Sequence, residues 1–109
     1  MEMLTKLEEL ILLSVLKLGD NAYGTTIYKY IKEVTGKKLS LGGVYFPLDR
    51  LTQRGYLNSY TAQATQERRG LSKRYYRLTQ KGITALNEIH SVNNILWSDF
   101  SNLAGRISK

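Results

Sequence analysis

The sequence predicts one mainly α-helical domain that carries a small β-hairpin and continues into a long C-terminal helix. Three observations lead to this prediction. Apolar residues recur at helical spacing in three successive segments, two β-rich runs then flank a polar loop, and helical spacing returns after the second run. The chain has 109 residues, which suits a single domain with a modest core.

The first helix is expected between Thr5 and Gly19. Thr5 and Glu8 have the spacing of a capping box, and Gly19 is a suitable residue for ending the helix. The apolar residues that recur at helical spacing here are Leu4, Leu7, Leu10, Ile11, Val15 and Leu18. This pattern predicts one buried face.

A second helix is predicted next, with Asp20 or Asn21 as its N-cap and Gly36 at its end. Its apolar residues are Ile27, Tyr28, Ile31 and Val34. A short strand at Lys38 and Leu39 is expected to follow it.

The third helix is predicted from an N-cap at Ser40 to about Arg54, and Gly55 is expected to terminate it. Its predicted buried face consists of Val44, Leu48 and Leu51. Pro47 lies inside this segment. A proline there removes one backbone donor and clashes with the carbonyl of Gly43, which costs roughly 3 kcal/mol unless the helix bends.

Residues 56–64 and 72–79 are rich in β-forming residues and are separated by a polar loop, which predicts a hairpin. Side chains alternate between the two faces of a strand. Leu78 is expected to point to the core, and Tyr76 is therefore expected to pack as well. Tyr75, on the other face, is expected to be exposed.

Helical spacing then returns and predicts a continuous helix over residues 79–103. Such a helix would be about 37 Å long, whereas a compact domain of this size has a radius of gyration of only about 13 Å. We therefore expect residues 80–109 to form a dimerisation helix beside a domain of residues 1–79, in one compact unit. The residues expected in the dimer interface are Leu86, Ile89, Val92, Leu96, Phe100 and Leu103, and the apolar series ends at Ile107.

Asn93 lies beside this apolar stripe, where a polar side chain can fix the register of a helix pair. The alternative is that the helix folds back on its own domain.

The positive charge of the chain is concentrated in one segment. Residues 37–82 contain ten Lys and Arg against two Asp and Glu, a net charge of +8, whereas residues 1–36 carry −1 and the remainder is neutral. Because duplex DNA presents a dense line of phosphates, a basic helix and hairpin are typical of a DNA-binding protein.

The expected DNA-contacting residues lie on the third helix, on the segment before it and on the hairpin. They are Lys37, Lys38, Ser40, Gly42, Gly43, Tyr45, Phe46, Arg50, Gln53, Arg68, Arg69, Lys73 and Arg74. Gln53 and Arg50 are expected to reach base edges or phosphates, and the basic residues of the hairpin to contact phosphates.

Structural alternatives exist for several of these residues. Arg50 can instead pair with Asp49 or cap a neighbouring carbonyl, and Gln53 can simply be solvated. Tyr45 can fill the seam between the second and third helices. The basic hairpin can be no more than a solubilising surface.

Other classes of protein have little support. The absence of cysteine excludes disulfides, thiolate zinc sites and cysteine nucleophiles. His90 is the one histidine, and no nucleophile stands beside a plausible base, so we expect no enzyme activity, metal or cofactor. The apolar run of residues 10–16 is far shorter than the roughly 20 residues of a membrane span. We therefore expect a cytoplasmic protein.

Three helices followed by a two-stranded ribbon form the order of a winged helix-turn-helix, in which the third helix enters the major groove. Three segments resemble the PadR-type transcriptional regulators in order and separation. They are AYGTTIYKYI at residues 22–31, GGVYFPLDRLTQRGYL at residues 42–57 and GLSKRYYRLTQKG at residues 70–82.

The resemblance covers about residues 7–86 and includes one departure. The family usually has proline directly after the tyrosine of the third helix, whereas here Phe46 follows Tyr45 and Pro47 comes one residue later. This departure affects the tilt and register of the helix, and with them the preferred DNA sequence.

The resemblance implies a homodimeric transcriptional regulator, most simply a repressor, that binds double-stranded operator DNA. Because members of this family respond to aromatic small molecules, it also implies that Trp97 and Phe100 are candidates for an effector site. Packing within the apolar stripe is the alternative for these two rings. An alternative function is a winged-helix module that binds a protein or RNA without operator specificity.

Overall fold

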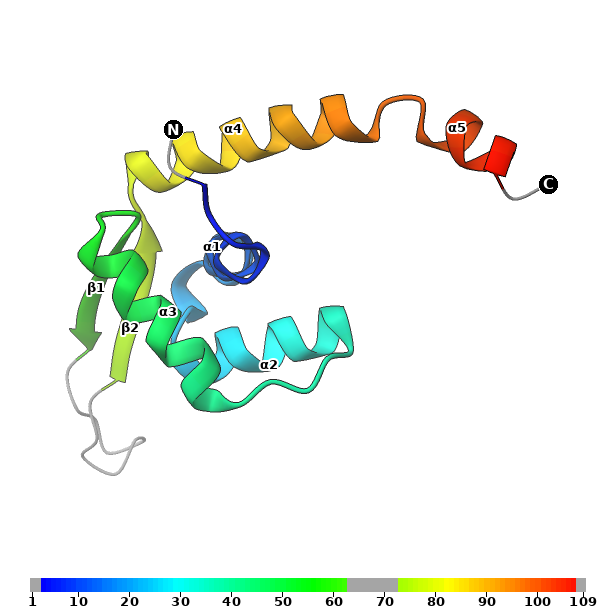
Figure 1. Cartoon of the computed structure of the whole chain (residues 1–109). Coiled ribbons are helices and arrows are strands. Elements are labelled where there is room, and N and C mark those ends of the chain that lie inside the picture. The colour runs from blue at the N-terminus through cyan, green and yellow to red at the C-terminus, as the bar shows by residue number, and fades with distance from the viewer. Residues whose placement is uncertain (1–2, 63–72, 108–109) are drawn as a thin grey trace.

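The computed structural model of the chain describes residues 3–62 and 73–107 (Figure 1). The elements in chain order are α1 (Lys6–Leu18), the 3-10 turn η1 (Gly19–Asn21), α2 (Gly24–Thr35), α3 (Leu41–Gln53), β1 (Leu57–Ala62), β2 (Lys73–Leu78), α4 (Gln80–Trp97) and α5 (Phe100–Ile107). The two strands pair antiparallel. The predicted fold class, mainly α-helical with a small β-hairpin in a winged helix-turn-helix and a long C-terminal helix, is confirmed.

The core lies between the first three helices and the hairpin. The residues that form it are Ile11, Leu12, Val15, Ala22, Ile27, Ile31, Val44, Leu48, Leu51, Tyr56, Leu57 and Tyr76. The buried face predicted for the third helix is confirmed, because Val44, Leu48 and Leu51 are fully buried. Burying such large aliphatic side chains stabilises a fold by about 1.5–3 kcal/mol each.

The predicted ends of α1 are confirmed. The Glu8 N–H donates to Thr5 Oγ1 at 3.1 Å, and the Thr5 N–H donates to Glu8 Oε1 at 2.8 Å, which completes the capping box. Gly19 follows the helix with a φ of 58°, in the left-handed range that glycine adopts without strain.

The predicted N-cap of α2 at Asp20 or Asn21 is wrong. These residues form η1, and α2 begins only at Gly24, with Tyr23 as its N-cap. The reason is tertiary: Ala22 is buried, and its carbonyl accepts the Tyr76 N–H of the hairpin at 2.9 Å, which keeps this segment extended.

The segment between α2 and α3 also differs from its prediction. Residues 36–40 contain no strand, so the predicted short strand at Lys38 and Leu39 is wrong. Ser40 does cap α3 as predicted, since its Oγ accepts the Gly43 N–H at 3.0 Å. Pro47 lies within α3 on the buried face, so its ring contributes to packing.

The hairpin register places Leu57 opposite Leu78 and Tyr60 opposite Tyr75. Tyr76 is buried as predicted. Tyr75 is half-buried rather than exposed, because it packs between two other tyrosine rings. The tip of the hairpin, including the predicted contacts Arg68 and Arg69, lies outside the described residues.

The prediction of one continuous C-terminal helix is wrong. The helix breaks at Ser98 and Asp99, where Asp99 has a φ of 59°. Two side chains stabilise this corner: Ser98 Oγ donates to the Ile95 carbonyl at 2.7 Å, and Asn102 Nδ2 donates to Asp99 Oδ1 at 2.7 Å. Local hydrogen bonds of this kind compete with the helical pattern.

The second half of α4, together with α5, projects from the rest of the molecule, as predicted from the length of the C-terminal segment (Figure 1). In Figure 1 α4 and α5 extend along the top. The start of α3, the C-terminal end of β1 and the N-terminal end of β2 lie in the lower part. The molecule measures 61 × 29 × 20 Å. Within the described ranges, no helix combines the length and apolar character needed to cross a membrane.

Candidate nucleic-acid interface

The exposed face of α3 lies opposite its buried side, as the helical period requires. Because Val44, Leu48 and Leu51 point inward, the opposite side presents Gly42, Gly43, Phe46, Asp49 and Gln53 to solvent. The two glycines leave the start of this face flat. Phe46 is 73% exposed, so most of its apolar ring faces solvent.

Tyr45 lies at the border of this face and fills the seam between α2 and α3. A methyl group placed on Gly24 would overlap the Tyr45 ring, so the ring covers the start of α2 directly. The alternative interpretation of Tyr45 as a seam residue therefore agrees with its packing. The side chain is still partly exposed.

An ion pair links α3 to the wing, which is defined here as β1 and β2. Arg74 Nη1 lies 3.9 Å from Asp49 Oδ1, and both side chains are more than half exposed. A pair of this kind contributes little to stability because water screens it. It does place the Arg74 guanidinium beside the exposed face of α3.

The neighbouring wing residue, Lys73, lies over the start of α2. Its Nζ is 4.2 Å from the centre of the Tyr23 ring, a cation–π contact. A hollow of about 330 Å³ lies between these elements, lined by Tyr23, Gly24, Thr25, Tyr45, Lys73 and Arg74. Lys73, Arg74 and the first turn of α2 therefore face the same hollow. Because the start of a helix carries partial positive charge, this hollow suits an anion.

The outer face of the wing holds a tyrosine cluster that periodicity alone did not predict. Tyr75 stacks on Tyr60 with ring centres 5.6 Å apart and meets Tyr23 edge-on at 5.4 Å. Arg77 lies over Tyr60 at 4.7 Å and pairs with Asp20 at 3.8 Å. Alternation along β2 placed Tyr75 and Arg77 on one face, but the position of Tyr23 depends on the tertiary fold.

Arg50 has a partner that the sequence pattern did not indicate. Its Nη2 lies 3.7 Å from Glu8 Oε2, and Arg54 Nη1 lies 3.2 Å from the same oxygen. The predicted alternative of an Arg50–Asp49 pair is not formed, since Asp49 pairs with Arg74 instead. Arg50 remains half exposed, at the edge of the α3 face.

Tyr76 is a core residue whose side chain lies near Asp49 and Arg74. Burial raises the pKa of Tyr76 above its ordinary value of 10.0, and the negative charge of Asp49 adds to the increase. Arg74 acts in the opposite direction. Tyr76 is therefore a neutral core side chain near neutral pH.

The remaining described residues predicted to contact DNA are exposed and lie before α3. Lys37 and Lys38 are exposed in the connection between α2 and α3, just before Ser40. All described residues predicted to contact DNA therefore lie on the connection, on α3 or at the start of β2.

A second surface lies on the C-terminal helices. Leu86 and Ile89 of α4 are half-buried against their own domain, whereas Val92, Leu96, Phe100 and Leu103 are exposed. Trp97 and Phe100 pack on each other across the corner, with ring centres 4.9 Å apart, and both rings remain more than half exposed. The first half of α4 thus folds onto its own domain, while the second half presents an apolar surface.

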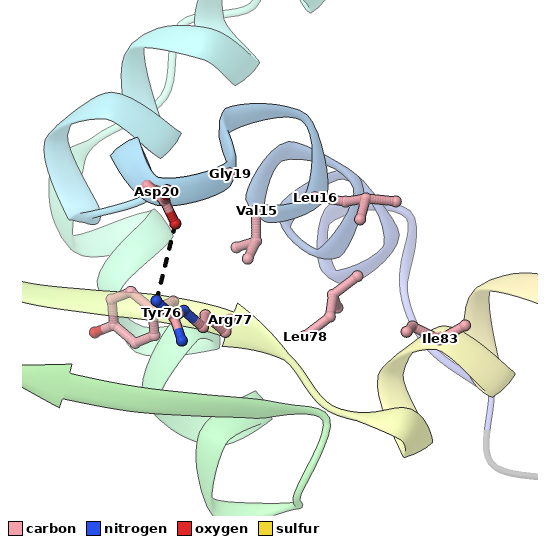
Figure 2. Close-up of a pocket in the computed structure, with 8 residues that line it drawn as sticks. All are labelled: Val15, Leu16, Gly19, Asp20, Tyr76, Arg77, Leu78 and Ile83. Carbon is pink, nitrogen blue, oxygen red and sulfur yellow. Dashed lines mark ion pairs between the residues drawn. The ribbon is translucent and has the colours of Figure 1, made fainter.

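Figure 2 shows a further hollow, of about 250 Å³, at the root of the wing. Apolar side chains from the end of α1, from β2 and from the start of α4 line it, and the Asp20–Arg77 ion pair lies at its edge. Among the residues that the structure describes, no three His, Cys, Asp or Glu side chains are grouped as a metal site requires.

Comparison with known families gives one match that covers most of the chain. Residues 12–88 match the model of the Transcriptional regulator PadR-like family. No curated protein matches the chain.

Several solved structures have the same fold. A PadR-like transcriptional regulator from Bacillus cereus has a TM-score of 0.73 and 21% identity over 90% of each chain. A PadR family regulator from Clostridium difficile has a TM-score of 0.67 and 22% identity over 96% of this chain and all of the other. A transcriptional regulator from Clostridium thermocellum has a TM-score of 0.69 and 25% identity, over 87% of this chain and 89% of the other.

Proposed function

Because the chain belongs to the PadR-like family of transcriptional regulators, we propose that it is a sequence-specific, homodimeric repressor whose DNA binding responds to a small aromatic molecule. DNA-binding regulation, rather than catalysis, follows from the family itself. The sequence specificity, the dimer, the sign of regulation and the effector are our proposal.

The observation that carries the proposal is the joint position of α3 and the wing. The exposed face of α3 offers Phe46 and Gln53 to base edges, while Arg50 at its border and Lys73 and Arg74 of the wing are available to phosphates. The hollow between α2, Tyr45 and the wing suits a phosphate of the same duplex.

Dimerisation is supported by the exposed apolar surface of α4 and α5. A monomer rarely leaves a contiguous surface of this kind in water. A two-fold partner covering it would hold two α3 helices on one side of the DNA, about 34 Å apart, which is one turn of the duplex. Repression would follow from blocking polymerase at the operator.

The effector is proposed to bind beside Trp97 and Phe100, at the end of α4. Both rings are exposed and lie at the corner between two helices, so a flat aromatic compound can stack on them where two subunits meet. It would shift the spacing of the two α3 helices by favouring one dimer geometry. Phenolic acids and planar cationic dyes should quench Trp97 fluorescence; absence of quenching and of any change in melting temperature would contradict this site.

DNA binding is tested by measuring affinity for duplexes at several salt concentrations. Replacing Lys73 or Arg74 with Ala should weaken binding to every duplex and reduce the salt slope by about 0.9 for each phosphate that the variant no longer neutralises. Selection from random duplexes should then give an operator. Affinity that does not change with salt would instead favour the alternative function, a module that binds a protein partner.

A further inference from the structure

Glu8 is a buried carboxylate between α1 and α3. Its side chain is only 3% exposed. Its Oε1 accepts the Thr5 N–H at 2.8 Å and so closes the capping box of α1. Its Oε2 faces two guanidinium groups from the C-terminal end of α3, at 3.2 Å from Arg54 and 3.7 Å from Arg50.

The capping box alone does not require this charge. Glutamine serves the same role at the third position of a helix, without burying an ion. A carboxylate out of water is costly unless it is paired with opposite charge and hydrogen-bonded. The negative charge of Glu8 is therefore explained by the two arginines rather than by the cap.

The two arginines differ in how tightly they are held. Arg54 donates a hydrogen bond to Glu8, and its side chain is 35% exposed. Arg50 is 51% exposed, and its 3.7 Å separation from Glu8 makes an ion pair without a hydrogen bond. Glu8 thus orients the Arg50 side chain while leaving its N–H donors available.

We propose that Glu8 is a positioning residue for DNA recognition, which presents the Arg50 guanidinium to a DNA phosphate at the edge of α3. This inference rests on the proposed DNA binding. A free arginine loses rotamer freedom when it binds, whereas one already held by a buried carboxylate loses less. Arg50 lies at the border of the α3 face and not at its centre. Its contact is therefore with the DNA backbone, and it does not depend on the DNA sequence.

The experiment compares Glu8→Gln with Glu9→Gln in the full chain, using duplex binding at several salt concentrations. Glu9 pairs with Lys6 instead, at 3.5 Å, so its substitution removes the same charge from the same helix. Glu8→Gln should bind both operator and random duplex about two- to tenfold more weakly than Glu9→Gln, the range expected for ordering one side chain. Its salt slope should fall by up to about 0.9.

A double substitution then identifies Arg50 as the residue through which Glu8 acts. In an Arg50→Gln background, Glu8→Gln should cause no further decrease in affinity, whereas independent effects would add. A structural role for Glu8 would lower the melting temperature but would leave the two effects on affinity additive. If Glu8→Gln does not fold, Glu8→Asp is compared with Glu9→Asp. Each keeps the charge but shortens the side chain by one methylene group, which draws the carboxylate at position 8 away from Arg50.

Three outcomes would overturn the inference: equal binding by the two glutamine variants, tighter binding by Glu8→Gln, or an undiminished effect in the Arg50→Gln background. A wild-type chain that binds no duplex in a salt-dependent way would overturn the proposed function itself. The two failures are therefore distinguishable.

Discussion

Phe46 exposes most of an apolar ring on α3. It is 73% exposed and lies among polar residues and glycines. In the major groove the apolar group available to such a ring is the methyl group of thymine. At the residue scale, Phe46 is therefore a candidate for reading one base, beside Gln53.

Replacing thymine with uracil tests this role, since uracil lacks the methyl group. At one operator position the wild-type protein should prefer thymine about three- to fivefold, the value of burying one methyl group. Phe46→Ala should abolish this preference, whereas Gln53→Ala should retain it. Uniform tolerance of uracil along the whole operator would exclude Phe46 from base reading.

Tyr76 gives a second prediction at this scale, on the dependence of stability on pH. Its pKa is raised in the folded chain by burial and by Asp49, so the native state holds the phenolic proton more tightly than the unfolded state. The stabilisation that results from this raised pKa is present below pH 10 and is lost as the pH rises through the pKa of Tyr76 in the folded chain. Chemical denaturation should show a smaller alkaline decrease in stability for Tyr76→Phe than for wild type; equal decreases would contradict the assignment.

At the scale of elements, the chain depends on a close approach between α4 and the residues that join α3 to β1. Gly82 lies in the first turn of α4, directly against the carbonyl of Tyr56. Thr79 caps this helix, and its hydroxyl donates to the Gly55 carbonyl at 2.6 Å. Lys81 donates to the Arg54 carbonyl at 2.7 Å, so three successive contacts attach α4 to the end of α3.

Gly82→Ala should lower the free energy of unfolding by about 1–3 kcal/mol, as overpacking does in other cores. The added methyl group would meet backbone, which cannot rotate away as a side chain can. Gly105→Ala is the control, because that position faces open space within α5. Thermal and denaturant unfolding measure the stability of both variants. If Gly82→Ala is as stable as the control, α4 is not held at this point.

At the scale of the whole molecule, the proposed DNA-binding surface and the apolar surface lie on opposite sides of the domain (Figure 1). α3 and the wing occupy one side, and the exposed half of α4 with α5 occupies the other. A partner on the apolar side would leave both α3 helices free to meet DNA. Leu96, which is 73% exposed on α4, belongs to this surface.

Leu96→Glu should therefore yield a monomer that has lost tight operator binding, because a charge cannot be buried between the subunits without a partner. Asn87→Glu is the matched control, since Asn87 is exposed on the polar side of α4. Sedimentation and gel shift compare the two variants. A wild-type monomer, or a Leu96→Glu dimer, would contradict the proposed assembly.

The sequence by itself determined the order of three helices, a hairpin and a C-terminal helical segment, the capping box of Thr5 and Glu8, the buried face of α3 and the basic segment. These features depend on local periodicity and on residues three or four positions apart, which a single chain segment contains. The motifs also identified the family correctly. The residue contacts to DNA, the dimer and the effector stay predictions.

The break at Ser98 and Asp99 is local, but periodicity did not predict it, because side-chain hydrogen bonds three residues apart there compete with the helical pattern. Only the tertiary structure decided the start of α2 and the partner of Arg50, since both depend on groups that are distant in sequence. The Ala22 carbonyl accepts a hydrogen bond from Tyr76, and the Arg50 side chain is attracted by Glu8, 42 positions earlier in the chain. Periodicity contains no information on such contacts, because it describes which face of an element is buried but not what covers it.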